Sequence, residues 1–277
     1  MQLREYSLPA GWFPRGSEEV SSEISRFLSG KEIFPHSRAV ISPHAGWYYS
    51  GSLAALSIAN LDKDAQTVAV FGGHLPSGSP PLFAMEDAVR TPFGAFSIDT
   101  ELRSALVKEI NGKEDKYRDN TVEVLLPMVH FFFPEAQVLW LRLGEDMASF
   151  EAGKTVSKTA GWLGRKINVI ASTDLTHYGN NYGFSPKGGG AAALRWVRDV
   201  NDASFIKAVE SADAGEVLRR ACTESSSCSA GAVLGAMGFA GEEKLGSAHL
   251  LEYATSADIN KSVVPDSFVG YAAMAFK

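Results

Sequence analysis

The stretch RAVISPHAGW, residues 38–47, places a histidine directly behind a short apolar run. The run 38–42 contains the β-branched pair Val40 and Ile41 and is followed by Pro43, which favours a buried strand. It does not alternate between polar and apolar residues, as expected for a strand that is covered on both faces. Such a strand, followed at once by a loop, is typical of the parallel sheet of an α/β protein.

Comparable runs recur along the whole chain. The further strand candidates are residues 67–71 (TVAVF), 137–143 (QVLWLRL), 168–172 (NVIAS), 249–254 (HLLEYA) and 268–276 (FVGYAAMAF). Helical spacing of apolar residues is found at 20–28 before Gly30, at 52–61, at 102–110 behind Asp99 or Thr100 as a cap, and at 156–163, 191–200 and 204–210. The alternation predicts an α/β fold: one layered domain over residues 1–277, with a central, mostly parallel sheet and helices on both faces.

Two segments have the composition of loops. Residues 72–81 (GGHLPSGSPP) and 179–190 (GNNYGFSPKGGG) are dense in Gly, Pro, Ser and Asn. Neither is flanked by a change in composition, so they are predicted to be loops at the active face of one domain and not linkers between domains.

Composition excludes several classes of protein. The 277 residues carry a net charge of −6, with 45% hydrophobic and 21% charged residues. This balance is that of a globular protein, and it argues against nucleic acid as a partner because no basic stripe is present. No apolar stretch approaches the ~18 residues that suggest a membrane span, and the N-terminus does not resemble a signal peptide. Two cysteines are too few for a disulfide scaffold, so a reduced, cytoplasmic protein is expected.

Three of the six histidines follow predicted strands. His44, His74 and His177 come after the strands that end at residues 42, 71 and 172. Ligands of open α/β sheets bind beyond the carboxyl ends of the strands, where several loops converge. We therefore expect a shared site built from these three side chains. The other histidines have no such setting, and His130, inside the helical run 125–133, is assigned a packing role.

Cys228 is a further candidate for the site. It precedes the Ala/Gly-rich helical run 229–240, so its thiol should lie near a helix N-terminus, where the dipole favours the thiolate. A thiolate is a nucleophile and a soft metal ligand, whereas a buried cysteine also serves as a small apolar residue, and position alone does not choose between these roles. Cys222, within the helical stretch 215–222, is expected to be packed. Nucleophile-elbow, H-E-x-x-H, Walker A and C-x-x-C motifs are absent from the sequence.

The run Pro43-His44-Ala45-Gly46-Trp47-Tyr48-Tyr49-Ser50-Gly51 resembles the most specific signature of the Memo-like family, which comprises the eukaryotic cell-motility mediator and its archaeal and bacterial relatives. Further matches span nearly the whole chain: Gly73-His74, Thr91-Pro92-Phe93-Gly94 with Ile98-Asp99, Glu123 with Leu126-Pro127, residues 172–178 (STDLTHY), Cys228, Tyr253-Ala254-Thr255-Ser256 and Val269-Gly270-Tyr271.

The resemblance implies a fold similar to class III extradiol dioxygenases, which hold Fe(II) through two histidines and a carboxylate. In the Memo-like family a cysteine takes the place of the carboxylate. The resemblance therefore implies a mononuclear site with His44, His74 and Cys228 as ligands, and with Asp174 and His177 as acid–base groups. The expected cofactor is one transition-metal ion, Fe(II) or copper, with zinc as the alternative.

The sequence departs from the family pattern at two places. The family has a second histidine directly after the one that matches His74, and here that residue is Leu75. The histidine of its E-H-S element is replaced by Asn120. Both changes leave the implied ligands in place, but they remove groups that could orient a substrate or transfer protons.

Three functions are compatible with these residues. The first is a redox-metal enzyme that acts on a small molecule, because a His₂Cys site with open positions suits Fe(II) or copper. The second is a non-catalytic binding module with a vestigial metal pocket, in keeping with the protein partners of the eukaryotic member. The third is a metal-free hydrolase or transferase in which Cys228 is the nucleophile, His177 the base and Asp174 the group that orients it.

Overall fold

A computed structural model describes residues 1–259 and 264–277 of the chain. Its main sheet, in the described part, has nine strands in the order β10-β12-β2-β9-β3-β8-β4-β7, with β11 paired to β12. The strands of this sheet are β2 (Ala39–Ser42), β3 (Thr67–Leu75), β4 (Leu82–Phe83), β7 (Lys113–Glu114), β8 (Gln137–Gly144), β9 (Ile167–Ser172), β10 (His177–Gly179), β11 (Ala248–Thr255) and β12 (Ser267–Phe276). A small second sheet has the order β1-β5-β6, with β1 (Leu3–Arg4), β5 (Ala88–Thr91) and β6 (Gly94–Ser97).

The main sheet is parallel at its centre and antiparallel toward its edges. β2, β9, β3 and β8 run parallel to one another, whereas β12 is antiparallel to β2, β10 and β11, and β4 is antiparallel to β8. The predicted α/β sheet is thus confirmed, and it is a mixed sheet whose parallel part contains the four strands that precede or surround the predicted site.

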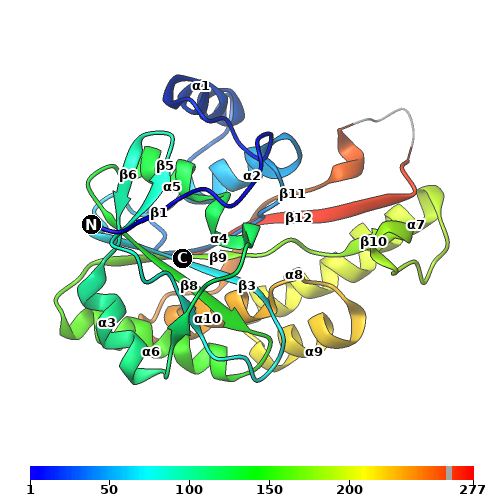
Figure 1. Ribbon diagram of the computed structural model, residues 1–277. Coiled ribbons are helices and arrows are strands. Elements are labelled where there is room, and N and C mark those ends of the chain that lie inside the picture. The colour runs from blue at the N-terminus through cyan, green and yellow to red at the C-terminus, as the bar shows by residue number, and fades with distance from the viewer. Residues whose placement is uncertain (260–263) are drawn as a thin grey trace.

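Helices cover both faces of this sheet (Figure 1). The α-helices are α1 (Ser17–Leu28), α2 (Trp47–Ala59), α3 (Thr100–Glu109), α4 (Asn120–Glu123), α5 (Leu126–Phe132), α6 (Ala148–Trp162), α7 (Gly190–Trp196), α8 (Ala203–Glu210), α9 (Ala214–Glu224) and α10 (Ala230–Glu242). Two 3₁₀ turns, η1 (Asn180–Tyr182) and η3 (Ser256–Asp258), and one π-helical segment, η2 (Val197–Asp202), complete them. Among the described helices, none combines the length and apolar character that a membrane span requires.

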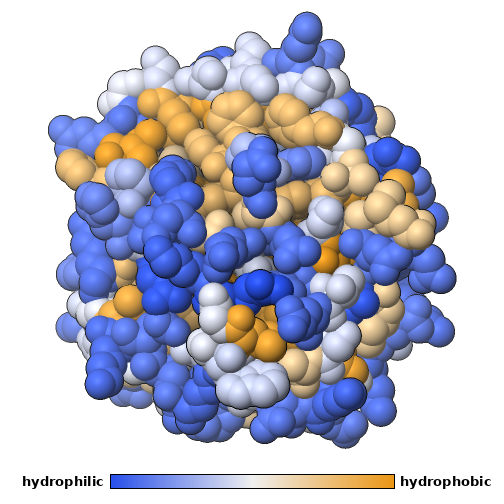
Figure 2. All heavy atoms as spheres, turned by 90° about the vertical axis from the view of Figure 1, so that its left-hand side faces the viewer, coloured by the Kyte–Doolittle hydropathy of each residue, from blue (hydrophilic) through white to orange (hydrophobic). Residues whose placement is uncertain are grey.

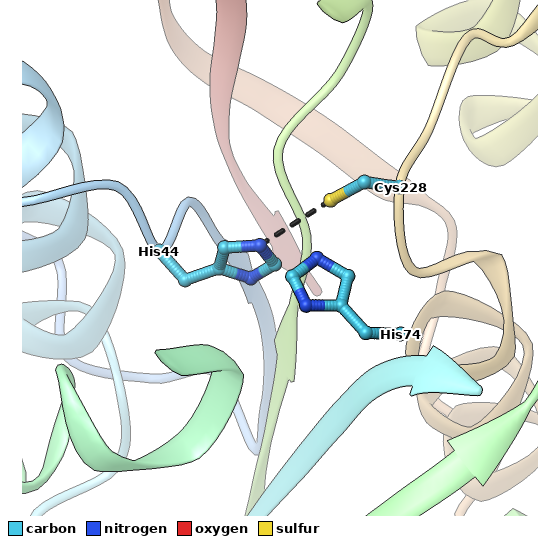
Figure 3. A group of neighbouring side chains, drawn as sticks. All are labelled: His44, His74 and Cys228. Atoms are coloured by element: carbon cyan, nitrogen blue, oxygen red, sulfur yellow. Dashed lines mark hydrogen bonds between the residues drawn. The ribbon is translucent and has the colours of Figure 1, made fainter. Parts of the chain in front are cut away.

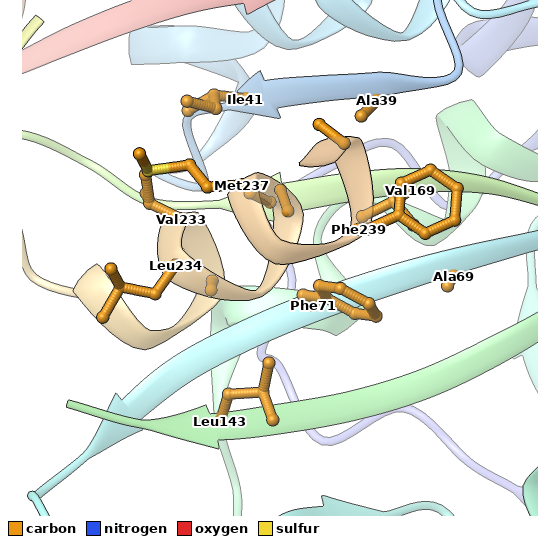
Figure 4. Close-up of a cluster of buried hydrophobic side chains, with 14 of the residues drawn as sticks. Ala39, Ile41, Ala69, Phe71, Leu143, Val169, Val233, Leu234, Met237 and Phe239 are labelled. Atoms are coloured by element: carbon orange, nitrogen blue, oxygen red, sulfur yellow. The ribbon is translucent and has the colours of Figure 1, made fainter. Parts of the chain in front are cut away.

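The apolar residues of the central strands fill two large cores, and two smaller apolar clusters lie beside them. Ala69 and Phe71 of β3 belong to the core beneath α6 and α10, whereas Val68 and Val70 of the same strand belong to the core beneath α1, α2 and α5. Alternate side chains therefore enter opposite layers, which explains why the strands read as continuous apolar runs. Figure 4 shows the first core, where α10 lays its apolar side chains across the neighbouring strands.

Two predicted helix ends are confirmed by their capping contacts. The Asp99 side chain accepts a hydrogen bond of 3.0 Å from the Leu102 amide, which makes it the N-cap of α3. Gly30 follows the C-cap of α1 and has a φ of +74°, a left-handed conformation that favours glycine. These local signals fix where the two helices stop and start.

Several predicted boundaries were wrong. Residues 72–75 are not part of a loop, because β3 continues through Gly72 and Gly73 to Leu75. α2 begins at Trp47 and not at residue 52, and the helix predicted over 191–200 becomes π-helical at Val197. Cys222 is exposed and not packed.

Figure 2 views the side of the molecule that carries the N-terminus and the small sheet. Most of this side is hydrophilic, and apolar side chains gather in its upper half. The cores take up most but not all of the large apolar residues, and the others remain at the surface.

Candidate metal centre

The carboxyl ends of three neighbouring strands form the base of the site. β2, β9 and β3 lie side by side and parallel. His44 follows the end of β2, Asp174 follows the end of β9, and His74 lies within the last residues of β3. Because parallel strands end at the same edge of a sheet, all three side chains reach the same region. The sequence prediction named His177 and not Asp174 as the third of them, and His177 lies at the start of β10.

His74 reaches this region because two glycines precede it. A Cβ atom at Gly72 would lie 2.3 Å from Thr121 Oγ1, and one at Gly73 would lie 2.4 Å from Ser229 Cβ. The pair therefore lets the end of β3 pass tightly between α4 and the start of α10. His74 itself has a φ of +56°, a left-handed conformation that is rare for a residue with a side chain. The pairing of β3 with β8 also shifts register between Gly72 and Leu75. This shift and the backbone turn at His74 together bring the imidazole next to the segment that carries Cys228.

Cys228 lies in the segment between α9 and α10, just before Ser229, the N-cap residue of α10. Its amide donates a hydrogen bond of 3.2 Å to the carbonyl oxygen of Asp174, which ties this segment to the end of β9. Its sulfur lies 3.3 Å from Nε2 of His44 (Figure 3). The sulfur and one ring nitrogen from each of His44 and His74 all lie within 4.8 Å of one another. The three side chains that the family resemblance implies as ligands are thus brought together.

The two histidines differ in exposure and in the partner of Nδ1. His44 is 1% exposed, and its Nδ1 lies 3.0 Å from the Ser172 hydroxyl. The side chain of His74 is 32% exposed, and its Nδ1 lies 3.0 Å from Oδ2 of Asp119. Both rings therefore use Nδ1 for a protein contact, which leaves Nε2 for the shared site.

The electrostatics of the cluster favour an ionised sulfur and raise the pKa of the rings around it. Burial alone would raise the pKa of Cys228, but His44, His177 and His74 outweigh it and hold this pKa well below its ordinary value. Burial likewise opposes a charge on His74, yet Asp119 and Cys228 raise the pKa of this ring to about 10. For His44, Asp174 and Cys228 raise the pKa against the effect of burial. A thiolate surrounded by imidazoles is the state from which a cysteine binds a metal or attacks an electrophile.

Asp174 and His177 lie beside this cluster. Asp174 accepts a hydrogen bond of 2.8 Å from the His44 amide, and its other oxygen lies 3.9 Å from His44 Nε2 and 3.8 Å from His177 Nε2. His177 starts β10, so it is not held at the edge of the parallel strands in the way that His44 is. Burial lowers the pKa of His177, but Asp174 and Cys228 raise it to about 10. Within the described residues, its Nε2 has no hydrogen-bond partner.

A cleft of about 1030 Å³ opens over the two histidines. His44, His74, Asp174 and His177 line it, and five aromatic residues add to its wall: Trp12, Tyr48, Tyr49, Tyr182 and Tyr271. Cys228 is not part of the described wall. The volume of the cleft is that of a pocket for a small organic molecule.

The N-terminal segment also contributes to this wall, which no sequence pattern predicts. Ala10, Gly11 and Trp12 line the cleft. The segment before them is anchored by the buried Glu123, whose carboxylate accepts hydrogen bonds from the Ser7 and Leu8 amides. No local pattern signals a contact between residues so far apart in the chain.

The two family departures have different outcomes. Asn120 lines the cleft, and its amide nitrogen donates a hydrogen bond of 2.9 Å to the carbonyl oxygen of His44. It thereby fixes the backbone of a candidate ligand. Leu75 is the last residue of β3 and is not among the residues that line the described part of the cleft.

The described donor set fits a transition-metal ion. Two imidazole nitrogens and one thiolate are ligands that iron, copper and zinc all accept, and their spacing allows one ion to reach all three. Asp119 supports one of the rings, as carboxylates commonly do for histidine ligands.

Sequence comparison with known proteins points to one family. Residues 4–275 match the family described as Memo-like protein. The chain is 30% identical to a MEMO1 family protein of Pyrococcus abyssi and 28% identical to one of Pyrococcus horikoshii, with 99% of this chain and at least 99% of each relative aligned. It is also similar to the crystal structure of an uncharacterized protein of Escherichia coli K12, with 12% identity and a TM-score of 0.49, over 86% of this chain and 99% of that one.

Proposed function

The chain belongs to the Memo-like family, and on that premise we propose that it binds one transition-metal ion through His44, His74 and Cys228. The observation that supports the proposal is the convergence of these three donors, within 4.8 Å of one another, from β2, β3 and the segment before α10. Three separated parts of the chain supply them, so the cluster is not a by-product of one local turn.

We propose iron or copper as the metal. A thiolate makes the site softer than the two-histidine, one-carboxylate site of non-haem iron enzymes. Copper can therefore compete with Fe(II) for binding to this site. Zinc is the redox-inert alternative. When bound, such a metal supplies one-electron redox chemistry and positions for a small molecule. The cleft above His44 and His74 has room for that molecule.

The surrounding residues supply proton chemistry at the same place, which supports an oxidoreductase of the dioxygenase-like kind. His177 lines the cleft, and the charge of Asp174 at 3.8 Å holds a proton on its Nε2. A protonated imidazole in this position can donate a proton to a molecule bound in the cleft. Asp174 also fixes the His44 backbone, so one carboxylate serves a ligand and a proton donor.

Metal content tests this proposal. Protein purified anaerobically should carry or take up about one metal ion per chain, with iron and copper above zinc. His44→Ala and Cys228→Ala should each lower this ratio, because each removes one of three ligands. His36→Ala, which alters an exposed histidine outside the cluster, is the matched control and should leave the ratio unchanged. Undiminished binding in both site variants would rule out the proposed ligands.

A specific contact favours a second candidate, a metal-free cysteine hydrolase or transferase. The Cys228 sulfur lies 3.3 Å from an imidazole nitrogen, the arrangement of an activated nucleophile. The imidazole at this distance belongs to His44 and not to His177, the base that the sequence suggested. The alkylation experiment in the Discussion separates this candidate from the metal site.

A further inference from the structure

Asp119 makes contacts with both of its carboxylate oxygens. Oδ1 accepts a hydrogen bond of 2.8 Å from the Thr121 amide and another from the Thr121 hydroxyl. Oδ2 lies 3.0 Å from Nδ1 of His74 and 3.2 Å from Nη2 of Arg142. A carboxylate with this many donors around it acts only as an acceptor. The proton in the contact with His74 therefore belongs to the ring, on Nδ1.

Arg142 holds Asp119 in this position. The residue is 3% exposed and lies on β8, next to the strand that carries His74. Its Nη1 lies 3.2 Å from Oδ1 of the fully buried Asp115, so the guanidinium is fixed from a second side. A buried charge is tolerated when it is paired and hydrogen-bonded in this way.

The same arginine also fixes the backbone before His74. Arg142 Nε donates a hydrogen bond of 3.0 Å to the carbonyl oxygen of Gly73, while the Gly73 amide donates one of 3.2 Å to Thr121 Oγ1. The left-handed φ of +56° at His74 costs energy, and such a conformation persists only where the surroundings hold it. Thr121 and Arg142 thus hold the amide and the carbonyl oxygen of Gly73 through hydrogen bonds, and Asp119 holds the imidazole ring of His74.

We infer that Asp119, held by Arg142, is a positioning residue that keeps the Nδ1 proton on His74 and thereby presents Nε2 to the metal. This inference rests on the proposed function, because it assigns a role to Asp119 only through a ligand. His44 offers an internal contrast, since its Nδ1 contacts the neutral Ser172 hydroxyl. A carboxylate partner increases the basicity of a histidine ligand more than a hydroxyl does.

The test compares three variants by titration with Co²⁺ and by ¹⁵N-histidine NMR of the metal-free protein. Asp119→Asn should weaken Co²⁺ binding about 10- to 100-fold, because an amide cannot accept from all four of these donors. It should also remove the Nδ1–H signal of His74. Asp119→Glu keeps the carboxylate and should restore both the signal and most of the affinity.

Asp115→Asn is the matched control. It removes a buried carboxylate from the same arginine but touches neither His74 nor Asp119 directly, so it should lower the unfolding temperature with a much smaller change in Co²⁺ affinity. Equal loss of affinity in both asparagine variants would reduce Asp119 to a purely structural role and overturn the inference. Wild-type Co²⁺ affinity in Asp119→Asn would also overturn the inference. If the wild type binds no Co²⁺, the proposed function fails, and the NMR signal alone decides whether Asp119 fixes the ring.

Discussion

Alkylation of Cys228 is expected to slow about 100-fold when zinc is present at 100 times its dissociation constant, because about 1% of the sites are then free of metal. A thiolate bound to a metal is shielded from an alkylating reagent, whereas the free thiolate is nucleophilic. The measurement is the rate of carbamidomethylation at Cys228, followed by mass spectrometry in a Cys222→Ser background. That background is needed because Cys222 is exposed and would react as well.

The metal-free protein provides an internal check through pH. His44, His177 and His74 hold the pKa of Cys228 well below its ordinary value, so its alkylation rate should change little from pH 7 to 9. Burial raises the pKa of Cys222, so in the wild-type chain its rate should keep rising over this range. His44→Ala should abolish the protection by zinc. A Cys228 alkylation rate that does not change with zinc but falls in His44→Ala would instead pair Cys228 with His44 as a nucleophile and base.

Gly153→Ala is expected to destabilise the protein by at least about 3 kcal/mol, at the upper end of overpacking effects. Gly153 lies on α6 against α10, and a Cβ atom there would lie 1.8 Å from the backbone oxygen of Gly235. A backbone atom cannot move away as a flexible side chain can, so the two helices would have to separate. Because α10 follows directly on Cys228, this separation should also disturb the site. The measurement is chemical denaturation followed by circular dichroism.

Gly161→Ala is the control on the same helix. A Cβ atom at Gly161 meets no other atom within 4 Å, so the change should be neutral or stabilise by up to about 1 kcal/mol through helix propensity. Equal destabilisation by both substitutions would show that glycine on α6 serves the helix itself and not its contact with α10.

The fold could be predicted from the sequence where local patterns decide it. Strands such as β2 and β9 are mostly apolar and buried at every position, because their alternate side chains enter the two large cores. The end of β3 could not be predicted, since Gly72 and Gly73 read as a loop until the packing of Thr121 and Ser229 against them is known. The two-residue strand β1 escaped notice for a similar reason: it exists only through its pairing with β5, far along the chain.

The candidate site shows the same division. Strand ends pointed to His44, His74 and His177, and the predicted helix start pointed to Cys228. Family resemblance then singled out His44, His74 and Cys228 as a ligand set. Asp119 and Arg142 carried no local signal, because a buried ion pair joins residues whose neighbourhood only the fold creates. Cys222 was a different kind of error. The buried residues Val217 and Ala221 mark the inner face of α9, and helical spacing then turns the next residue outward, so the helical period itself predicts an exposed Cys222.

The most direct test of the central claim is the X-ray absorption spectrum of the protein loaded with one equivalent of zinc. A site built from His44, His74 and Cys228 predicts one sulfur neighbour at about 2.3 Å and nitrogen neighbours at about 2.0–2.1 Å. The sulfur contribution should vanish in Cys228→Ala. A wild-type spectrum with nitrogen and oxygen neighbours alone would contradict the proposed metal centre.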